Sequence, residues 1–259
     1  MKENEPKKIY GMIFAAGLGT RLVPFTHTKP KALVPVGGVP MLERVIKRFI
    51  EAGITDIVVN VHHFAEQITD FLKQNNNFGI NIIISDESEL LLDTGGGIVN
   101  ASRFFNNADA VLIHNADILT DVELNDMVSH HFRKGADVTL LVSDRESSRV
   151  LYFDANSQMQ GWKNIRTGAT LPEGFDPDAT EGLRPRAFGG VHVVSASALD
   201  ALGRYTDKKV FSIIPFYSDS CRKMRIAGFE PESEYRWFDV GTPEKLAEAE
   251  KVYQSKNKD

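Results

Sequence analysis

Short apolar runs alternate with helical patterns along the first 143 residues. The runs are rich in Val, Ile or Phe, which favour strands, and they cover residues 9–16, 56–61, 80–85, 110–115 and 137–143. Strands that alternate with helices are typical of βα units over a mainly parallel sheet. The pattern predicts an α/β fold, with a Rossmann-like, mixed but mainly parallel sheet flanked by helices.

Three helices are expected between these strands. The first has one apolar face at helical spacing, made of Met41, Leu42, Val45, Ile46, Phe49 and Ile50. Gly53 follows it, where a left-handed C-cap residue is expected. The second and third helices are expected at about residues 65–75 and 119–134. A last helix is predicted to begin at Pro243, with Thr242 as its N-cap.

The regular pattern weakens after Arg145. Residues 167–185 contain several Gly, Pro, Asp and Glu and few apolar side chains, which predicts a long loop or a small subdomain. A strand is expected at 188–194 and an ordered segment at 212–217. A short run at 237–240 precedes the last helix.

Composition narrows the function. The 259 residues are 42% hydrophobic and 25% charged, enough for one large α/β domain. The single cysteine cannot form an internal disulfide, and the first ten residues lack the apolar core of a secretory signal, so a cytoplasmic location is expected. No apolar run is long enough to cross a bilayer. A formal net charge of -5 argues against a nucleic-acid partner, so any cations that bind phosphate must be gathered in one site.

A glycine-rich turn follows the first strand. Its residues are Ala15, Ala16, Gly17, Leu18, Gly19, Thr20 and Arg21. Open α/β sheets bind ligands at the carboxyl ends of their strands, and glycines let backbone amides approach phosphate oxygens. Leu22 stands at the third glycine of the dinucleotide fingerprint, and no G-K-[ST] follows, so neither standard phosphate motif is present. Spacing alone leaves a phosphate loop and an ordinary tight turn open.

The residues after this turn extend the pattern to G-x-G-T-R-L-x-P-x-T, followed by K-P-K-A-L-V-P-V. This run resembles the signature of the sugar-phosphate nucleotidylyltransferases. The resemblance implies that Ala15, Ala16, Gly17, Gly19 and Thr20 wrap the triphosphate of a nucleotide. It also implies that Arg21 holds the β and γ phosphates and that Lys31 bridges the reacting phosphates. Lys29 is either a further phosphate contact or a solvated loop charge.

Two carboxylates stand after expected strands. Asp117 follows the run at 110–115, and Asp239 follows Trp237 and Phe238. Either one alone would be explained as a turn or cap residue. Both resemble the paired metal-binding aspartates of the family, the second in the form W-x-D-x-G-T-P, although Ala116 stands where a glycine commonly precedes the first. The resemblance implies a Mg²⁺ site, which suits carboxylate and phosphate oxygens.

The segment 92–98 places three glycines at an expected helix start, where a flexible loop is the alternative. It resembles the family's L-G-T-A-G segment, so Thr94, Gly95 and Gly96 are expected to contact the nucleobase. Its form is most similar to the N-acetylmuramate 1-phosphate uridylyltransferases, with guanylyltransferases close, and UTP is the favoured nucleotide. Gly190 is expected near the sugar. Lys163 is a candidate for its phosphate, and Trp237 either walls the sugar site or belongs to the core.

The resemblance covers residues 10–252. It implies a GT-A-like nucleotide-diphospho-sugar transferase fold, with one catalytic domain over 1–259 and no C-terminal β-helix. Residues 8–143 are expected to form a nucleotide-binding half and 144–253 a sugar-binding half. The expected partners are an NTP and a sugar 1-phosphate, in a monomer or homo-oligomer. Two alternatives remain: a catalytically silent nucleotide-sugar-binding regulator, and a dinucleotide-dependent oxidoreductase, which the missing fingerprint disfavours.

Overall fold

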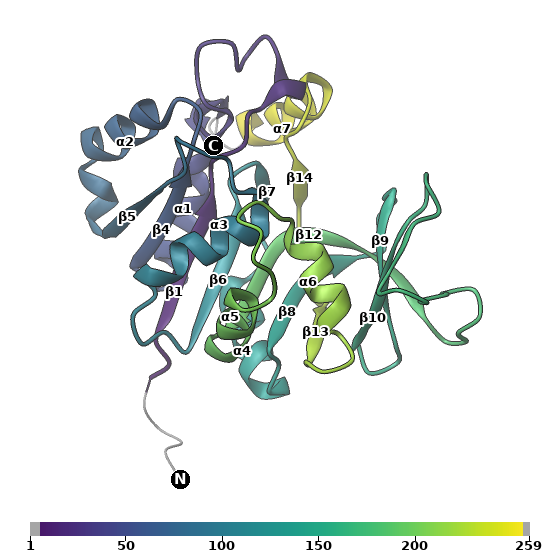
Figure 1. Cartoon of the computed structure of the whole chain (residues 1–259). Helices are drawn as coiled ribbons and strands as arrows, with labels where there is room; N and C mark the ends of the chain where they lie inside the picture. The colour runs from purple at the N-terminus through teal and green to yellow at the C-terminus, as the bar shows by residue number, and fades with distance from the viewer. Residues whose placement is uncertain (1–5, 256–259) are drawn as a thin grey trace. The chain divides into compact units, whose positions relative to one another are not determined.

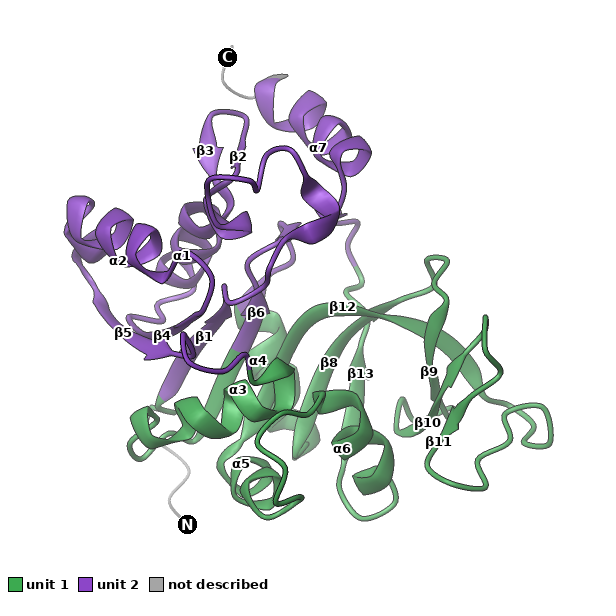
Figure 2. Ribbon diagram, turned by 45° about the horizontal axis from the view of Figure 1, so that its top comes forward, with its two compact units in different colours: residues 1–8, 92–112, 125–232 green, residues 9–91, 113–124, 233–259 purple. Residues whose placement is uncertain are grey.

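The computed structural model describes residues 6–255 (Figure 1). Residues 1–5, part of the stretch considered above for a secretory signal, lie outside the described residues. The chain forms two compact units (Figure 2). Unit 1 comprises Met1–Lys8, Leu92–Leu112 and Asn125–Glu232; unit 2 comprises Ile9–Leu91, Ile113–Leu124 and Ser233–Asp259. These units divide the chain differently from the expected halves at 8–143 and 144–253.

Unit 2 is built on a parallel sheet. Strand β1 (Ile9–Phe14) pairs with β4 (Asp56–Val61), which pairs with β5 (Asn81–Asp86). Helices α1 (Met41–Glu51) and α2 (Ala65–Gln74) connect these strands. The ring of Phe49 lies 3.1 Å from the point that a Cβ on Gly11 would occupy, so α1 packs closely on β1. Gly53, at a φ of 76°, ends α1 as expected.

The rest of unit 2 lies between these strands in sequence or in two later segments of the chain. Its remaining elements are η1 (Thr20–Leu22), η2 (Lys31–Leu33), β2 (Pro35–Val36), β3 (Val39–Pro40), η3 (Asn76–Gly79), β7 (Ile118–Thr120), β14 (Trp237–Asp239) and α7 (Pro243–Ser255). Strand β7 pairs antiparallel with β14, although more than one hundred residues separate them in sequence. The Thr242 hydroxyl accepts the amide of Lys245 at 3.5 Å, so the expected N-cap of α7 is confirmed.

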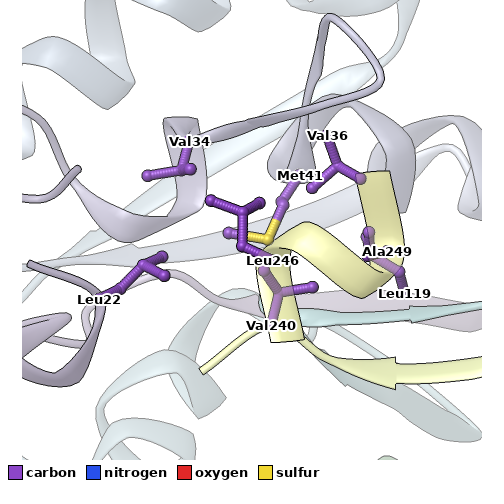
Figure 3. Packing of buried hydrophobic residues seen from close by; sticks show 8 residues of the cluster. All are labelled: Leu22, Val34, Val36, Met41, Leu119, Val240, Leu246 and Ala249. Carbon is purple, nitrogen blue, oxygen red and sulfur yellow. The ribbon is translucent and has the colours of Figure 1, made fainter. Parts of the chain in front are cut away.

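One apolar cluster joins these segments (Figure 3). It contains Leu22, Val34, Val36, Met41, Leu119, Val240, Leu246 and Ala249, each 5% exposed or less. The side chains come from η1, the segment around β2, α1, β7, the end of β14 and α7, and they point toward one another in the view. Burial of this surface is the main stabilising term that holds the loops of unit 2 against α7.

Most strand pairs of unit 1 are antiparallel, and β8 with β13 is parallel. Its elements are α3 (Asp93–Ala101), η4 (Ser102–Phe104), α4 (Leu124–Lys134), β8 (Val138–Ser143), β9 (Arg149–Phe153), β10 (Met159–Asn164), β11 (Thr170–Leu171), β12 (Arg184–Ser195), α5 (Ala196–Gly203), α6 (Ile213–Ser220) and β13 (Ile226–Phe229). The hydrogen-bonded order is β11-β10-β9-β12-β6, and β8 pairs with both β12 and β13. Strand β6 (Ala110–Asn115) has its first three residues in unit 1 and its last three in unit 2, where it neighbours β1.

The predicted α/β fold with a mixed sheet is confirmed, and two local predictions change. The helix expected from Leu119 begins at Leu124, because Leu119 lies on β7 and pairs with β14. The chain after Arg145 is not irregular: it forms β9 and β10. Strand β10 forms despite its weak apolar pattern, because it pairs with β9. The segment at 212–217 belongs mainly to helix α6. In the part of the chain that the structure describes, no helix is both long and apolar enough to cross a membrane.

Replacing Leu246 by Ala tests the apolar cluster of unit 2. The change removes a buried side chain and leaves a cavity, so the free energy of unfolding should fall by about 2 to 5 kcal/mol. Urea unfolding measures this loss. Leu90, which is 46% exposed, provides the control, and Leu90→Ala should change the value by less than about 0.5 kcal/mol. Equal losses for the two variants would contradict the packing described.

Buried His131 makes stability depend on pH. Desolvation lowers the pKa of His131 from 6.5 to about 4, and its Nδ1 lies 3.0 Å from Thr139 Oγ1. Because the folded pKa is lower than the unfolded one, the stabilisation is complete above pH 6.5 and is lost as the pH falls toward 4. This group should account for about 3 kcal/mol at most. His131→Asn should reduce the dependence of unfolding free energy on pH in this range. His27→Asn, at an exposed position, should leave the pH dependence of the unfolding free energy unchanged.

Candidate functional site

The glycine loop of unit 2 begins where β1 ends and is held by neighbouring strands. The amide of Ala15 donates to Asn60 Oδ1 at 2.8 Å, and Asn60 Nδ2 donates to Glu87 Oε1 at 2.8 Å. All three residues are buried, so Ala15 and Ala16 are fixed at the carboxyl edge of the parallel sheet. Gly17 is exposed, and a Cβ at this position would meet no atom within 4 Å. The loop therefore leaves backbone accessible at the edge where a ligand is expected.

Gly19 brings Lys31 to this loop. Its φ of 66° is in the left-handed region, and a Cβ would lie 2.8 Å from Thr26 Cγ2 and 3.1 Å from Lys31 Cβ. Both the backbone conformation and the close approach therefore require glycine here. The Thr26 hydroxyl donates to the Gly19 carbonyl at 2.9 Å, which holds the turn closed. Thr20 and Arg21 follow in η1.

Lys31 and Asp117 form an ion pair between the Lys31 ammonium and Asp117 Oδ2. The Lys31 side chain is only 11% exposed and that of Asp117 27%, so the pair is largely shielded from water. The Asp117 carbonyl accepts the amide of Val240 at 2.9 Å, next to the paired strands β7 and β14. This hydrogen bond puts the backbone of Asp117 beside the residue that follows Asp239.

Asp239 and Arg21 meet at Gly241. The point that a Cβ on Gly241 would occupy lies 2.9 Å from Asp239 Oδ1 and 3.4 Å from Arg21 Nη2. Lys245 Nζ donates to Asp239 Oδ2 at 3.0 Å. Arg21 is exposed, and within residues 6–255 its guanidinium makes no ion pair. Unit 2 thus brings together all four residues that the family signature predicts for catalysis and metal binding, from four separate segments.

The two carboxylates fit a magnesium ion held jointly with substrate. Among the described residues, no group of three or more His, Cys, Asp or Glu side chains could hold a metal ion by itself. Asp117 and Asp239 each accept a lysine ammonium, so both positions already accommodate positive charge. Magnesium is commonly bound by one or two carboxylates together with phosphate oxygens and water. The donor set therefore suits that ion once phosphates are present.

The predicted base-contacting residues lie in unit 1, at the start of α3. The amides of Gly95 and Gly96 both donate to the Phe211 carbonyl, at 2.9 and 3.2 Å. The Thr94 hydroxyl accepts the amide of Ile213 at 2.9 Å. A Cβ on Gly96 would lie 2.1 Å from the Lys209 carbonyl, so close packing explains why this position is glycine. Contact between these residues and a nucleobase stays a prediction.

The predicted sugar-contacting residues are distributed over three strands. Gly190, at a φ of 75°, lies where the register of β12 against β8 shifts between Phe188 and His192. Lys163 lies on β10 and donates to Asp178 at 2.9 Å, which raises the pKa of the ammonium above its ordinary value. Trp237 is half-buried on β14, in unit 2. Their roles in binding sugar stay predictions.

Sequence reasoning missed the residues that support the loop and the second aspartate. Asn60 and Glu87 carry no motif, although a polar residue within a buried strand was a signal that could have indicated Asn60. Lys245 lies one turn into α7, and nothing in its local sequence distinguishes it from other surface lysines. His62, directly after β4, has its Nδ1 2.7 Å from the Glu87 carbonyl.

With this geometry in place, the profile of the nucleotidyl transferase family matches residues 10–152, more than half of the chain. The chain belongs to this family. Its first half supplies the glycine loop, Lys31 and Asp117, which are within the matched region, whereas Asp239 lies beyond it.

Two relatives and two solved structures show the range of similarity. The N-acetylmuramate alpha-1-phosphate uridylyltransferase of Caulobacter vibrioides is 29% identical, over 92% of this chain and 94% of that protein. The mannose-1-phosphate guanyltransferase of Gibberella zeae is also 29% identical, but the chain spans only 64% of its length.

HddC from Yersinia pseudotuberculosis, complexed with GMP-PN, has a TM-score of 0.71 at 20% identity, covering 95% of this chain and 99% of that one. A putative glucose-1-phosphate thymidylyltransferase from Bacillus anthracis has a TM-score of 0.75 at 17% identity, covering 95% of each chain. The two structures support the fold.

Replacing Asn60 by Ala tests the support of the glycine loop. The variant leaves the buried amide of Ala15 without its acceptor, so the free energy of unfolding should fall by about 1 to 3 kcal/mol. The KM for the nucleotide should rise because the loop loses its fixed position. Asn81→Ala removes an exposed hydrogen bond to Asp56 on the same sheet and should change both quantities little. If the two variants behaved alike, the anchoring role of Asn60 would be wrong.

Proposed function

We propose that this protein is a sugar-1-phosphate nucleotidyltransferase that joins an NTP to a sugar 1-phosphate and releases pyrophosphate. UTP is the favoured nucleotide, and N-acetylmuramate 1-phosphate is the favoured sugar, with mannose 1-phosphate next. The observation that carries this proposal is the group formed by Arg21, Lys31, Asp117 and Asp239 in unit 2. Two cations and two carboxylates beside an accessible glycine loop suit a reaction between two phosphorylated substrates.

The reaction is a single displacement. An oxygen of the sugar 1-phosphate attacks the α-phosphorus of the NTP, and the bond from that phosphorus to the β-phosphate oxygen breaks. Pyrophosphate leaves with the bonding electron pair, so no covalent enzyme intermediate is needed. Arg21, exposed and planar, holds the outgoing phosphates by paired hydrogen bonds.

Lys31 has two alternative partners in this mechanism. In the structure its ammonium pairs with Asp117, at a site that is mostly shielded from water. When the nucleotide binds, its phosphates compete for this ammonium, which then neutralises charge on the reacting phosphates. The carboxylate of Asp117 becomes available at the same time. Asp117 and Asp239 would hold Mg²⁺, whose charge when bound favours the negative oxygens of the transition state.

Three observations support the favoured substrates. The N-acetylmuramate uridylyltransferase of Caulobacter vibrioides is similar over 94% of its own length, at 29% identity. A second enzyme of this name, from Neisseria meningitidis, is similar over 96% of its length at the same identity. The segment 92–98 has the form most similar to the same group. An NTP substrate also favours a cytoplasmic location, where nucleotide triphosphates are supplied.

A catalytically silent nucleotide-sugar-binding protein is the alternative. It would use the same fold and loop but would not need two carboxylates paired with lysines. The presence of Arg21, Lys31, Asp117 and Asp239 together favours the enzyme. Ligand titration with and without Mg²⁺ separates the two, since a regulator would bind a nucleotide sugar without turnover.

The test of the proposed function is pyrophosphate release by the purified protein with Mg²⁺. UTP, GTP, dTTP, CTP and ATP are each combined with the 1-phosphates of N-acetylmuramate, mannose, glucose and N-acetylglucosamine. The proposal expects release that requires both a particular NTP and a particular sugar phosphate, and most from UTP with N-acetylmuramate 1-phosphate. Tight nucleotide-sugar binding without release in any combination would support the regulator instead.

Replacing Asp117 by Asn tests the carboxylate assignment. Asn retains the shape but not the charge, so kcat should fall by roughly two to three orders of magnitude in a protein that still folds, which thermal unfolding checks. Asp70→Asn removes an exposed carboxylate on α2 in the same unit and should keep full activity. Normal turnover by Asp117→Asn would rule out the assignment.

A further inference from the structure

Unit 1 contains a pocket in which arginines from three segments meet. Its volume is about 560 Å³, within the range of small-molecule sites. The arginines are Arg145, after β8, Arg166, after β10, and Arg186, on β12. The proposed mechanism uses none of them.

Two of these guanidinium groups are fixed in place. Arg145 Nη2 donates to the carbonyl of Phe188 at 2.6 Å, and Arg186 Nε lies 2.8 Å from Glu230 Oε2. The Arg186 side chain is only 18% exposed. A guanidinium that is already held loses little conformational freedom when it binds an anion, so both positions are preorganised.

The third arginine lies at the exposed side of the pocket. Arg166 is exposed, and over the described range 6–255 its guanidinium makes no ion pair. Asp144 and Glu146 also line the pocket and are exposed. Glu230 balances the charge of Arg186, so the three guanidinium groups are matched by three carboxylates. Arg166, which pairs with none of these carboxylates, is the group that suits a ligand carrying a single negative charge.

The pocket adjoins the predicted sugar-binding residues. Arg145 contacts Phe188, two residues before Gly190, and Ala187 of the lining is on the same strand. Arg166 follows Lys163 by three residues, just beyond the end of β10. All of these residues belong to unit 1, so the pocket and the predicted sugar segment share one rigid scaffold of β9, β10 and β12.

We infer that this arginine pocket binds a carboxylate carried by the sugar 1-phosphate and so selects an acidic sugar. The inference rests on the proposed function and narrows its substrate class. Guanidinium groups bind carboxylates through paired, charge-assisted hydrogen bonds. N-acetylmuramate differs from N-acetylglucosamine by a lactyl ether that ends in a carboxylate, so a pocket that binds this carboxylate would distinguish the two otherwise identical sugars.

The experiment compares kcat/KM for N-acetylmuramate 1-phosphate and N-acetylglucosamine 1-phosphate, both with saturating UTP and Mg²⁺. The wild-type protein should prefer N-acetylmuramate. Arg166→Gln should lower the ratio of the two kcat/KM values by about tenfold or more, because one charge-assisted contact to the carboxylate is lost. Arg186→Gln should lower it further, with thermal unfolding measured to check that this variant is folded.

Arg149→Gln is the matched control. Arg149 is exposed on β9 between Ser148 and Val150, but it does not line the pocket, so the ratio should stay at the wild-type value. An equal loss for both sugars in Arg166→Gln would overturn the inference, as would a wild-type preference for a neutral sugar. Inhibition by inorganic phosphate that Arg166→Gln relieves equally for both sugars would assign the pocket to a free anion. Absence of pyrophosphate release with every sugar and nucleotide would instead count against the proposed function.

Discussion

A single apolar cluster in unit 2 connects the segments that carry the charged residues of the candidate site. Leu22 follows Arg21, Leu119 lies two residues after Asp117, and Val240 follows Asp239. Val34 lies at the end of the turn that begins with Lys31. Because each charged side chain is within three residues of a buried one, burial of the cluster fixes the backbone from which it projects. The charges then need little attraction of their own to stay close, and they remain available to a ligand.

The charges around this cluster are arranged so that ligands can exchange partners with them. Both carboxylates hold a lysine in the structure, and Arg21 holds none among the described residues. A phosphate that takes the Lys31 ammonium from Asp117 replaces one negative partner by another, so the shielded ammonium is not left without a counter-charge. Gly19 and Gly241 leave room for the side chains that approach them, and at Gly19 the backbone conformation itself requires glycine.

The sequence predicted the parallel βα framework well because its signals are local. Strands such as β4 and β6 each contain at least three consecutive apolar residues, and α1 has a clear apolar face with a glycine after its end. The sequence predicted β7 and β10 poorly. Strand β7 has only three residues and is determined by pairing with the distant strand β14. Strand β10 is a mixed polar run whose pairing with β9 the apolar pattern does not indicate. Likewise the signature indicated Arg21, Lys31, Asp117 and Asp239. It could not indicate Asn60 or Lys245, whose partners come together only in the fold.

The central claim is that the loop and carboxylates of unit 2 bind the nucleotide phosphates. The most direct measurement is a crystal structure of the protein with a non-hydrolysable UTP analogue and Mg²⁺. The account predicts that phosphate oxygens contact Arg21 and Lys31, and that the Lys31 ammonium has left Asp117. Phosphates bound elsewhere, with the pair between Lys31 and Asp117 intact, would contradict it.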